Sequence, residues 1–318
     1  MRVKQVFLGC LSIPLFFVVV ALVIGVLALA LGPPDHQPVD TVYEQPIDQA
    51  GDSKLRSQRL PRWADTDFGS PEVLDVVIDL QEGEFEIEPT NVGEAILIDA
   101  DYDEAMARLE RSFSSDPEDG DRLFIEFDGR GMMQQLRHLI HSRDQHINNR
   151  VRIQLPASVP MELYIRARKG ESKIDLSGLS LRLLVLEHAM GASEVYFDEP
   201  NPIPMEAADF RGKMGEFSVT GLGYTGARAV QFEAKMGDFR VDFRGPMPQD
   251  MIASVKVSMG SGHIRVPRDV RLDYDQRYVI FGDLSVRRRT DRRDAERASP
   301  QKTLSLNTSI KLGDMHVR

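Results

Sequence analysis

A short motif recurs along most of the chain: an apolar residue, commonly methionine, precedes a glycine that is followed by an acidic or small residue. From Gly170 to Gly282 the successive glycines lie 21, 24, 22, 23 and 22 residues apart. A nearly constant period of this length predicts a repeat protein, in which each unit packs on its neighbours to complete a shared core. The glycines assigned to the repeat are Gly83, Gly170, Gly191, Gly215, Gly237, Gly260, Gly282 and Gly313.

The residues around each glycine form columns that indicate the secondary structure. Four positions after the glycine, each unit from Gly170 onward carries valine or isoleucine, and the residue before that position is always polar. Such alternation with a period of two is typical of β-strands that bury one face. Each unit is therefore predicted to be a strand, a bend at the glycine and a second strand, with the methionine in the core. The β-branched column consists of Ile174, Val195, Val219, Val241, Ile264, Val286 and Val317.

Stacking of these units predicts an all-β fold, a β-solenoid similar to a parallel β-helix, over residues 151–318. The alternative is an antiparallel sandwich whose hairpins share a consensus. Residues 73–150 are expected to form an N-terminal β region with one amphipathic helix at 131–147, where apolar residues fall on one helical face. The strand patterns of this region lie at Val73–Glu88, Ala95–Ala100 and Leu123–Phe127.

The N-terminal segment has the composition of a membrane anchor. Residues 6–31 contain no charge, and about 20 apolar residues suffice for a helix to cross a bilayer. Arg2 and Lys4 precede this run. The positive-inside rule therefore predicts that residues 1–5 form a cytoplasmic tip and that everything after Leu31 lies outside a bacterial inner membrane. The sequence therefore predicts a single-pass transmembrane signal-anchor.

Two further expectations concern this end of the chain. Cleavage as a signal peptide near Ala28–Ala30 is the alternative, but the apolar run is longer than the roughly 7–15 residues of a usual signal peptide. Residues 32–72 are polar and rich in proline, which is typical of an extended linker. We therefore expect the anchor to be retained and the β domain to stand away from the membrane.

Charge and cysteine content exclude several functions. A net charge of −10 argues against nucleic-acid binding, which requires a basic surface. The single cysteine, Cys10, leaves no disulfide framework and no cysteine-based metal site outside the predicted anchor. His138 and His141 have a spacing that could share a metal ion, but a solvated polar face accounts for them better. No cofactor or metal is expected.

The acidic residues after the glycines are the most suggestive polar column. Stacked carboxylates could hold Ca²⁺, although acidic and small polar residues beside glycine are also ordinary turn chemistry, which we favour. These acids are Glu171, Glu216, Asp238, Asp283 and Asp314.

A basic insertion before the last unit provides a second polar candidate. It is predicted to be either a solvated loop or a contact to anionic envelope polymer or lipid headgroups. Its arginines are Arg287, Arg288, Arg289, Arg292 and Arg293.

Several segments resemble a known bacterial group. Val76–Leu80, Val151–Pro156, Ile174–Leu179 and Met259–Pro267 are similar to toast-rack and putative-adhesin domains, which are related to the C-terminal domain of LiaF-type cell-wall-stress proteins. The resemblance covers residues 73–318 and carries no catalytic residues. It implies a β-solenoid-like envelope domain connected with stress sensing or adhesion, although LiaF-type proteins typically have several membrane helices.

These observations favour a non-catalytic envelope protein that senses or scaffolds by binding a partner. The segment Met315–Arg318 is expected to be an uncovered edge strand, through which the chain would pair with another protein or with itself. A surface adhesin or glycan-binding module that contacts envelope polysaccharide is the alternative. A β-helix polysaccharide-active enzyme is disfavoured, because short uniform units leave little room for a catalytic groove.

Overall fold

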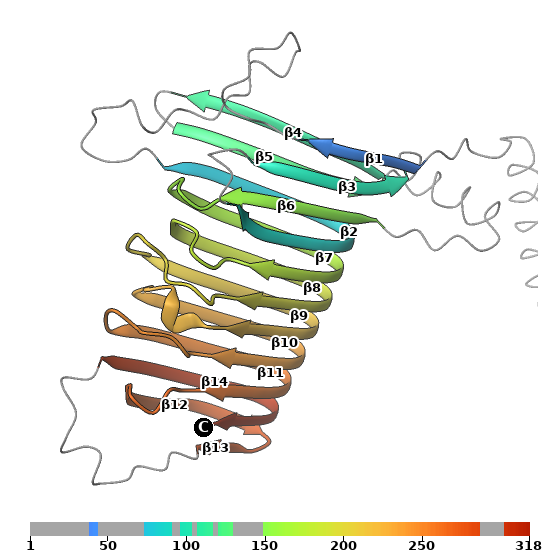
Figure 1. The fold of residues 1–318 in the computed structure, drawn as a ribbon. Helices are drawn as coiled ribbons and strands as arrows, with labels where there is room; N and C mark the ends of the chain where they lie inside the picture. The colour runs from blue at the N-terminus through green and yellow to red at the C-terminus, as the bar shows by residue number, and fades with distance from the viewer. Residues whose placement is uncertain are drawn as a thin grey trace, which may run out of the picture.

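The computed structural model describes residues 38–43, 73–90, 96–103, 107–116, 120–129, 149–286 and 302–318, which form an all-β fold (Figure 1). These residues contain no α-helix, and one 3-10 turn, η3 (Leu222–Tyr224), lies in a return loop. No helix in the part of the chain that the structure describes is long and apolar enough to cross a membrane. The anchor predicted at 6–31 and the helix predicted at 131–147 lie outside the described residues.

The strands fall into a stacked series and a smaller N-terminal group. One of them, β1, lies within the segment predicted to be an extended linker. In chain order they are β1 (Pro38–Tyr43), β2 (Leu74–Thr90), β3 (Leu97–Asp103), β4 (Ala107–Asp116), β5 (Gly120–Gly129), β6 (Arg150–Pro156), β7 (Met161–Asp175), β8 (Leu181–Tyr196), β9 (Ala207–Thr220), β10 (Ala229–Asp242), β11 (Met251–Arg265), β12 (Arg271–Phe281), β13 (Leu284–Val286) and β14 (Thr303–Val317).

The stacked series is parallel throughout. The order is β2-β7-β8-β9-β10-β11-β14-β12, and each neighbouring pair aligns its repeat glycines or the residues beside them. Gly215, for example, lies opposite Gly191 on one side and Gly237 on the other. Like-on-like parallel pairing agrees with the predicted solenoid and excludes the antiparallel sandwich for these units.

Each long strand is folded over at its glycine, so that its two halves face each other across the core (Figure 1). Inward residues alternate with outward ones in both halves, as the burial of β10 illustrates. Phe232 before the glycine and Phe239 after it are both buried, with ring centroids 6.1 Å apart. The core is therefore a continuous apolar column that no single coil could bury alone.

The stack ends differently at the two extremes. At the N-terminal end, β2 pairs in parallel with β5 through its first half and with β6 through its second half. Antiparallel partners follow: β4 on β5, and β3 then β1 beyond β6. The solenoid thus changes from a parallel to an antiparallel arrangement at this end.

At the C-terminal end, the last two coils are out of chain order. Strand β14 pairs with β11 on one side and with β12 and β13 on the other. The expectation that Met315–Arg318 would form an uncovered edge was therefore wrong, because the segment lies between two coils. The outer coil among the described residues is β12–β13, which precedes β14 in sequence.

Candidate functional site

The most distinctive surface of the solenoid lies where the strands bend. In β9, Gly212 and Phe217 are buried, whereas Lys213, Met214 and Glu216 are exposed. The positions two before, one before and one after the repeat glycine therefore all face outward. Gly212 and Phe217 both face inward although they are five residues apart, whereas strict alternation would bury one of them and expose the other. The alternation is therefore interrupted at the bend.

The bend depends on glycine for two reasons, which Gly237 illustrates. Its φ of +129° lies in a region that L-residues with a side chain rarely adopt. A Cβ there would also collide with the carbonyl oxygen of Gly215 on the preceding coil. The same collision recurs from coil to coil at Gly170, Gly191, Gly215, Gly237, Gly260, Gly313 and Gly282, whereas at Gly83 the nearest atom is the Asn149 carbonyl oxygen.

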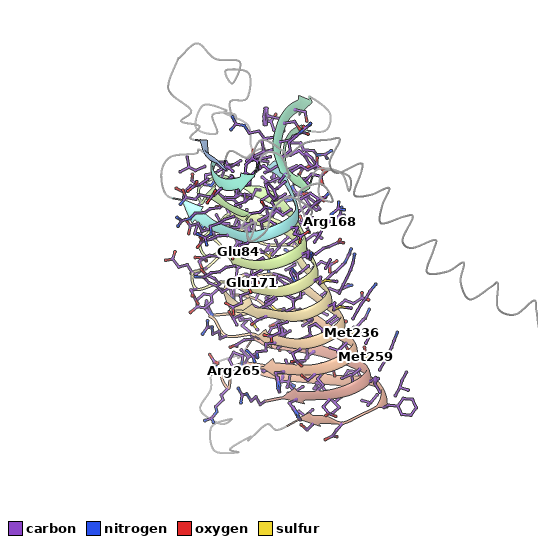
Figure 2. The ribbon with its side chains drawn as sticks, turned by 90° about the vertical axis from the view of Figure 1, so that its right-hand side faces the viewer. Glu84, Arg168, Glu171, Met236, Met259 and Arg265 are labelled. Carbon is purple, nitrogen blue, oxygen red and sulfur yellow. The ribbon has the colours of Figure 1, made fainter. Side chains whose placement is uncertain are left out.

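Large apolar side chains project from this bend. They are 42 to 68% exposed, so the expectation that the methionine before the glycine would be core was wrong. The alternation ends just before the glycine, since Lys235 and Met236 are both exposed, and this residue therefore faces outward. We call the apolar column the bend ridge, and Figure 2 shows Met236 and Met259 on the same bent side of neighbouring coils. In stacking order, it consists of Met190, Met214, Met236, Met259, Leu312 and Phe281.

Charged columns flank the bend ridge on opposite sides. One position before the apolar residue come Lys213, Lys235 and Lys311, and directly after the glycine come Glu216, Asp238 and Asp314 on the same three coils. Coils β8 and β11 carry no charge on either flank, having Ala189 with Ala192 and Ser258 with Ser261. On the outer coil Asp283 follows Gly282 but Ile280 takes the position of the lysine, so bases and acids occur together on β9, β10 and β14.

These flanking charges have few partners within the described part of the chain. None of the three lysines makes an ion pair there. Asp238 accepts a hydrogen bond from the Ser261 hydroxyl, and Asp314 accepts one from the backbone N–H of Asp283 at 3.0 Å. No group of three or more His, Cys, Asp or Glu side chains among the described residues comes together as a metal site. Both hydrogen bonds join the acids to the neighbouring coil.

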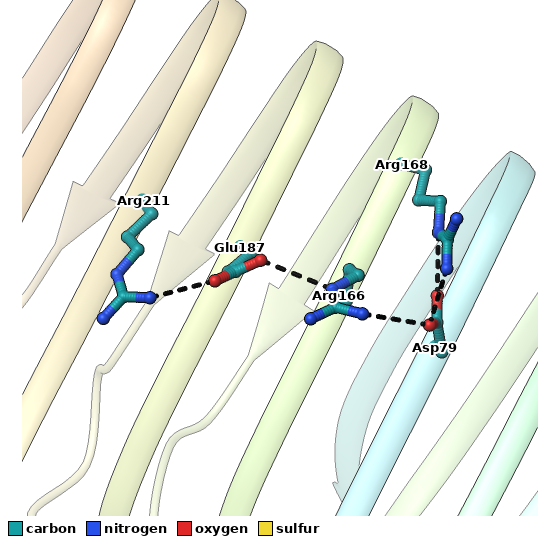
Figure 3. A network of polar contacts seen from close by, with 5 residues as sticks. All are labelled: Asp79, Arg166, Arg168, Glu187 and Arg211. Atoms are coloured by element: carbon teal, nitrogen blue, oxygen red, sulfur yellow. Dashed lines mark hydrogen bonds and ion pairs between the residues drawn. The ribbon is translucent and has the colours of Figure 1, made fainter.

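The outward face of the first strand halves is different, because its charges pair along the stack (Figure 3). Arg166 lies between Asp79, with Nη1 to Oδ2 at 3.5 Å, and Glu187, with Nε to Oε2 at 3.3 Å. Arg211 contacts the other oxygen of Glu187 at 3.0 Å. A hydrogen bond to Asp79 raises the pKa of Arg168. We call Asp79, Arg166, Glu187 and Arg211 the charge ladder.

A polar hollow lies near the C-terminal end of the stack. The rings of His263 and His316 are stacked with centroids 5.5 Å apart, and the Ser285 hydroxyl lies 2.6 Å from Nδ1 of His316. The hollow has a volume of about 360 Å³, and Asp283 and Arg318 also line it. Within the described residues, no carboxylate hydrogen-bonds the other ring nitrogen of His316, which a serine–histidine catalytic pair would need for orientation.

Other candidates from the sequence are placed as follows. The glycines of the repeat form one column in adjacent coils. The basic insertion, Arg287, Arg288, Arg289, Arg292 and Arg293, lies outside the described residues, as do His138 and His141. Lys213, Lys235 and Lys311 each lie two residues before a repeat glycine, a regularity that is visible in the sequence.

Solved structures similar to this chain share little sequence with it. A putative cell adhesion protein from Clostridium sporogenes is 9% identical with a TM-score of 0.37, over 88% of this chain and 99% of that chain. A putative adhesin from Bacteroides fragilis is 10% identical with a TM-score of 0.32, over 90% and 100%. A putative lipid binding protein from Parabacteroides distasonis is 12% identical with a TM-score of 0.35, over 90% and 100%.

The family comparison is more specific. No curated protein matches the chain. Residues 51–202, which include the described coils from β2 to β8, match the family model of the N-terminal domain of toast_rack, DUF2154. This match lies over the segments whose glycine bends and parallel coils are described above. Residues 51–202 are therefore similar to the N-terminal domain of the toast-rack family.

Proposed function

We propose that this chain is a non-catalytic scaffold of the bacterial cell envelope that binds a macromolecular partner along the bend ridge. The observation that carries the proposal is the unbroken apolar column from Met190 to Phe281, exposed in every coil of that part of the stack. With strands about 4.8 Å apart, six coils give a column about 24 Å long. Contiguous exposed apolar surface is typical of interaction sites.

The rest of the geometry supports binding better than chemistry. The ridge is a convex line on a rigid stack and not a pocket that could enclose a small substrate. Methionine suits a contact surface because its flexible, polarisable side chain adapts to a partner's shape. We propose that the predicted anchor holds this scaffold at the inner membrane, with the solenoid on the extracytoplasmic side.

Site-specific photo-crosslinking in cells tests this function. A photoreactive amino acid replaces Met236 on the ridge, and the matched control replaces Glu194, an exposed residue on the face of the second strand halves. Adducts are expected from the Met236 position and not from the Glu194 position. Equal adduct formation at both positions, or none at either, would show that the ridge is not the binding surface.

Adhesion to an envelope polymer is a second candidate, favoured by the polar hollow. Stacked imidazoles beside Arg318 offer a flat surface and a cation, which suit an anionic sugar polymer. Retention of the full chain on envelope polysaccharide, lost on His316→Ala and kept on Met236→Ser, would favour this function over the ridge.

A further inference from the structure

We propose that the partner on the bend ridge is a second copy of the same chain, packed side by side in the same direction about a two-fold axis that runs along the stack. The proposal rests on the ridge function above and names its occupant. It follows from the arrangement of charges on the two flanks of the ridge.

The first step is that charges within each flank repel one another. Lys213 and Lys235 lie on adjacent coils, as do Glu216 and Asp238. Like charges about 4.8 Å apart on neighbouring strands are unfavourable. The charge ladder avoids this by alternating sign from coil to coil, as Asp79, Arg166 and Glu187 show. The flanks of the ridge therefore have charge patterns that neighbouring coils do not neutralise.

The second step is geometric. When two ridges face each other about a two-fold axis parallel to the stack, the basic flank of one copy lies over the acidic flank of the other. Both copies then keep the same direction, so coil meets like coil. Lys213 meets Glu216 of the second copy, Lys235 meets Asp238, and Lys311 meets Asp314. The uncharged flanks of β8 and β11 also meet each other.

The opposite orientation is much less favourable. A two-fold axis across the ridge would run the stacks in opposite directions and would place lysines over lysines and acids over acids. Juxtaposed like charges of this kind act against an interface. The same-direction arrangement also leaves both N-terminal ends on one side, as two chains anchored in one membrane would require. Only one of the two symmetric ridge-to-ridge packings therefore fits the charges.

The size of the contact sets the expected affinity. The column is about 24 Å long and only a few side chains wide, including its charged flanks. The area it can bury is therefore smaller than the roughly 800 Å² per partner of a standard interface. We therefore expect weak self-association, in the micromolar range or weaker. Two chains held in one membrane gain effective concentration, which compensates for a small interface.

Disulfide crosslinking of the full chain in native membranes tests the geometry. In a Cys10→Ser background, Met190→Cys and Leu312→Cys lie at opposite ends of the methionine and leucine column. Each variant alone should form a crosslinked homodimer, because residues on the two-fold axis meet their own copies. Crosslinking only in a mixture of the two variants would mean opposite directions and would overturn the proposal. Glu194→Cys is the matched control and should not crosslink.

Charge reversal tests the recognition itself. One variant carries Lys213→Glu, Lys235→Glu and Lys311→Glu, and the other carries Glu216→Lys, Asp238→Lys and Asp314→Lys. The affinity with which each variant associates with itself should fall about tenfold or more. Co-purification of two differently tagged full-length chains measures this affinity. Mixed together, the two variants should associate again, since each flank then faces its opposite.

The outcomes separate this proposal from the function on which it rests. Failure of the mixed variants to associate, or absence of crosslinks from Met190→Cys and Leu312→Cys, overturns the two-fold pairing. If the photoreactive group at Met236 still forms adducts with a different protein, the ridge remains the binding surface with another occupant. If those adducts are also absent, both proposals fall.

Discussion

The charge ladder and the bend ridge are built from the same repeated coil, yet they treat charge in opposite ways. Along the ladder the sign alternates from coil to coil, and Arg166 and Arg211 share the carboxylate of Glu187. Along the ridge the sign is constant on each flank, and the lysines find no ion-pair partner among the described residues. Stacking places identical positions next to each other, so alternation is the arrangement that a single copy would favour. The ridge departs from it, and this departure is the basis for the proposal that its charges face a partner.

The largest expected effect concerns the backbone that creates the ridge. Gly237→Ala should lower the free energy of unfolding by about 3 kcal/mol, because positive φ and the collision with Gly215 add together. Gly120→Ala is the matched control, since Gly120 also has positive φ but open space around it, and it should lose about 1 kcal/mol. Denaturant unfolding followed by circular dichroism measures both. Equal losses would mean that the close approach of the coils does not matter.

A smaller effect tests the comparison of charges directly. Glu187→Gln removes the shared partner of Arg166 and Arg211 and should cost about 1 kcal/mol, a value limited by solvent screening. Lys235→Gln on the ridge should change the free energy of unfolding of the monomer by less than about 0.5 kcal/mol. Both are measured by denaturant unfolding at low protein concentration. A loss at Lys235 as large as that at Glu187 would contradict the contrast between the two regions.

The smallest expected effect appears only in acid and concerns His188, which lies on the core side of the bend. Burial lowers the pKa of His188 below its ordinary value of 6.5, and the Gly191 backbone offsets only part of this. Above pH 6.5 the ring of His188 is neutral in both states and does not lower the free energy of unfolding. As the pH falls below that value the free energy of unfolding decreases, because the unfolded chain binds the proton more readily than the folded chain.

The corresponding experiment compares melting temperatures between pH 8 and pH 5. The decrease on acidification should be smaller for His188→Leu than for the unsubstituted chain. The difference between the two proteins at pH 8 serves as the reference for changed packing. Identical decreases in both proteins would show that protonation of this ring does not weaken the core behind the ridge.

Much of the fold could be predicted from columns of residue types. Val219, Val241 and Ile264 are buried in adjacent coils, as their β-branched column predicted. The methionines were misplaced because the prediction carried the alternation of the first strand half up to the residue before the glycine. The alternation ends earlier, since Lys235 and Met236 are both exposed, and the buried pair Ala234 and Phe239, five residues apart, was the available signal.

The order of the last two coils could not be predicted in the same way. Val286 and Val317 both fit the β-branched column, so β12–β13 and β14 are equally suitable neighbours for β11 by pattern alone. The only signal was the 31-residue spacing from Gly282 to Gly313, which exceeds every earlier spacing from Gly170 onward. The pattern of the repeat specifies what a coil is, whereas the length of a connection determines where it can lie.

The insertion of β14 between β11 and β12 has a consequence for the sequence of folding events. The other coils can each add to a neighbour that was synthesised earlier, as in a stack that grows from one end. The described residues of β12 and β13 pair only with β14, which emerges after them. The outer coil must therefore wait for a later segment, and the vacant edge of β11 stays open to the wrong strand in the meantime. Completion of this end of the molecule is therefore expected to be a late, non-local step.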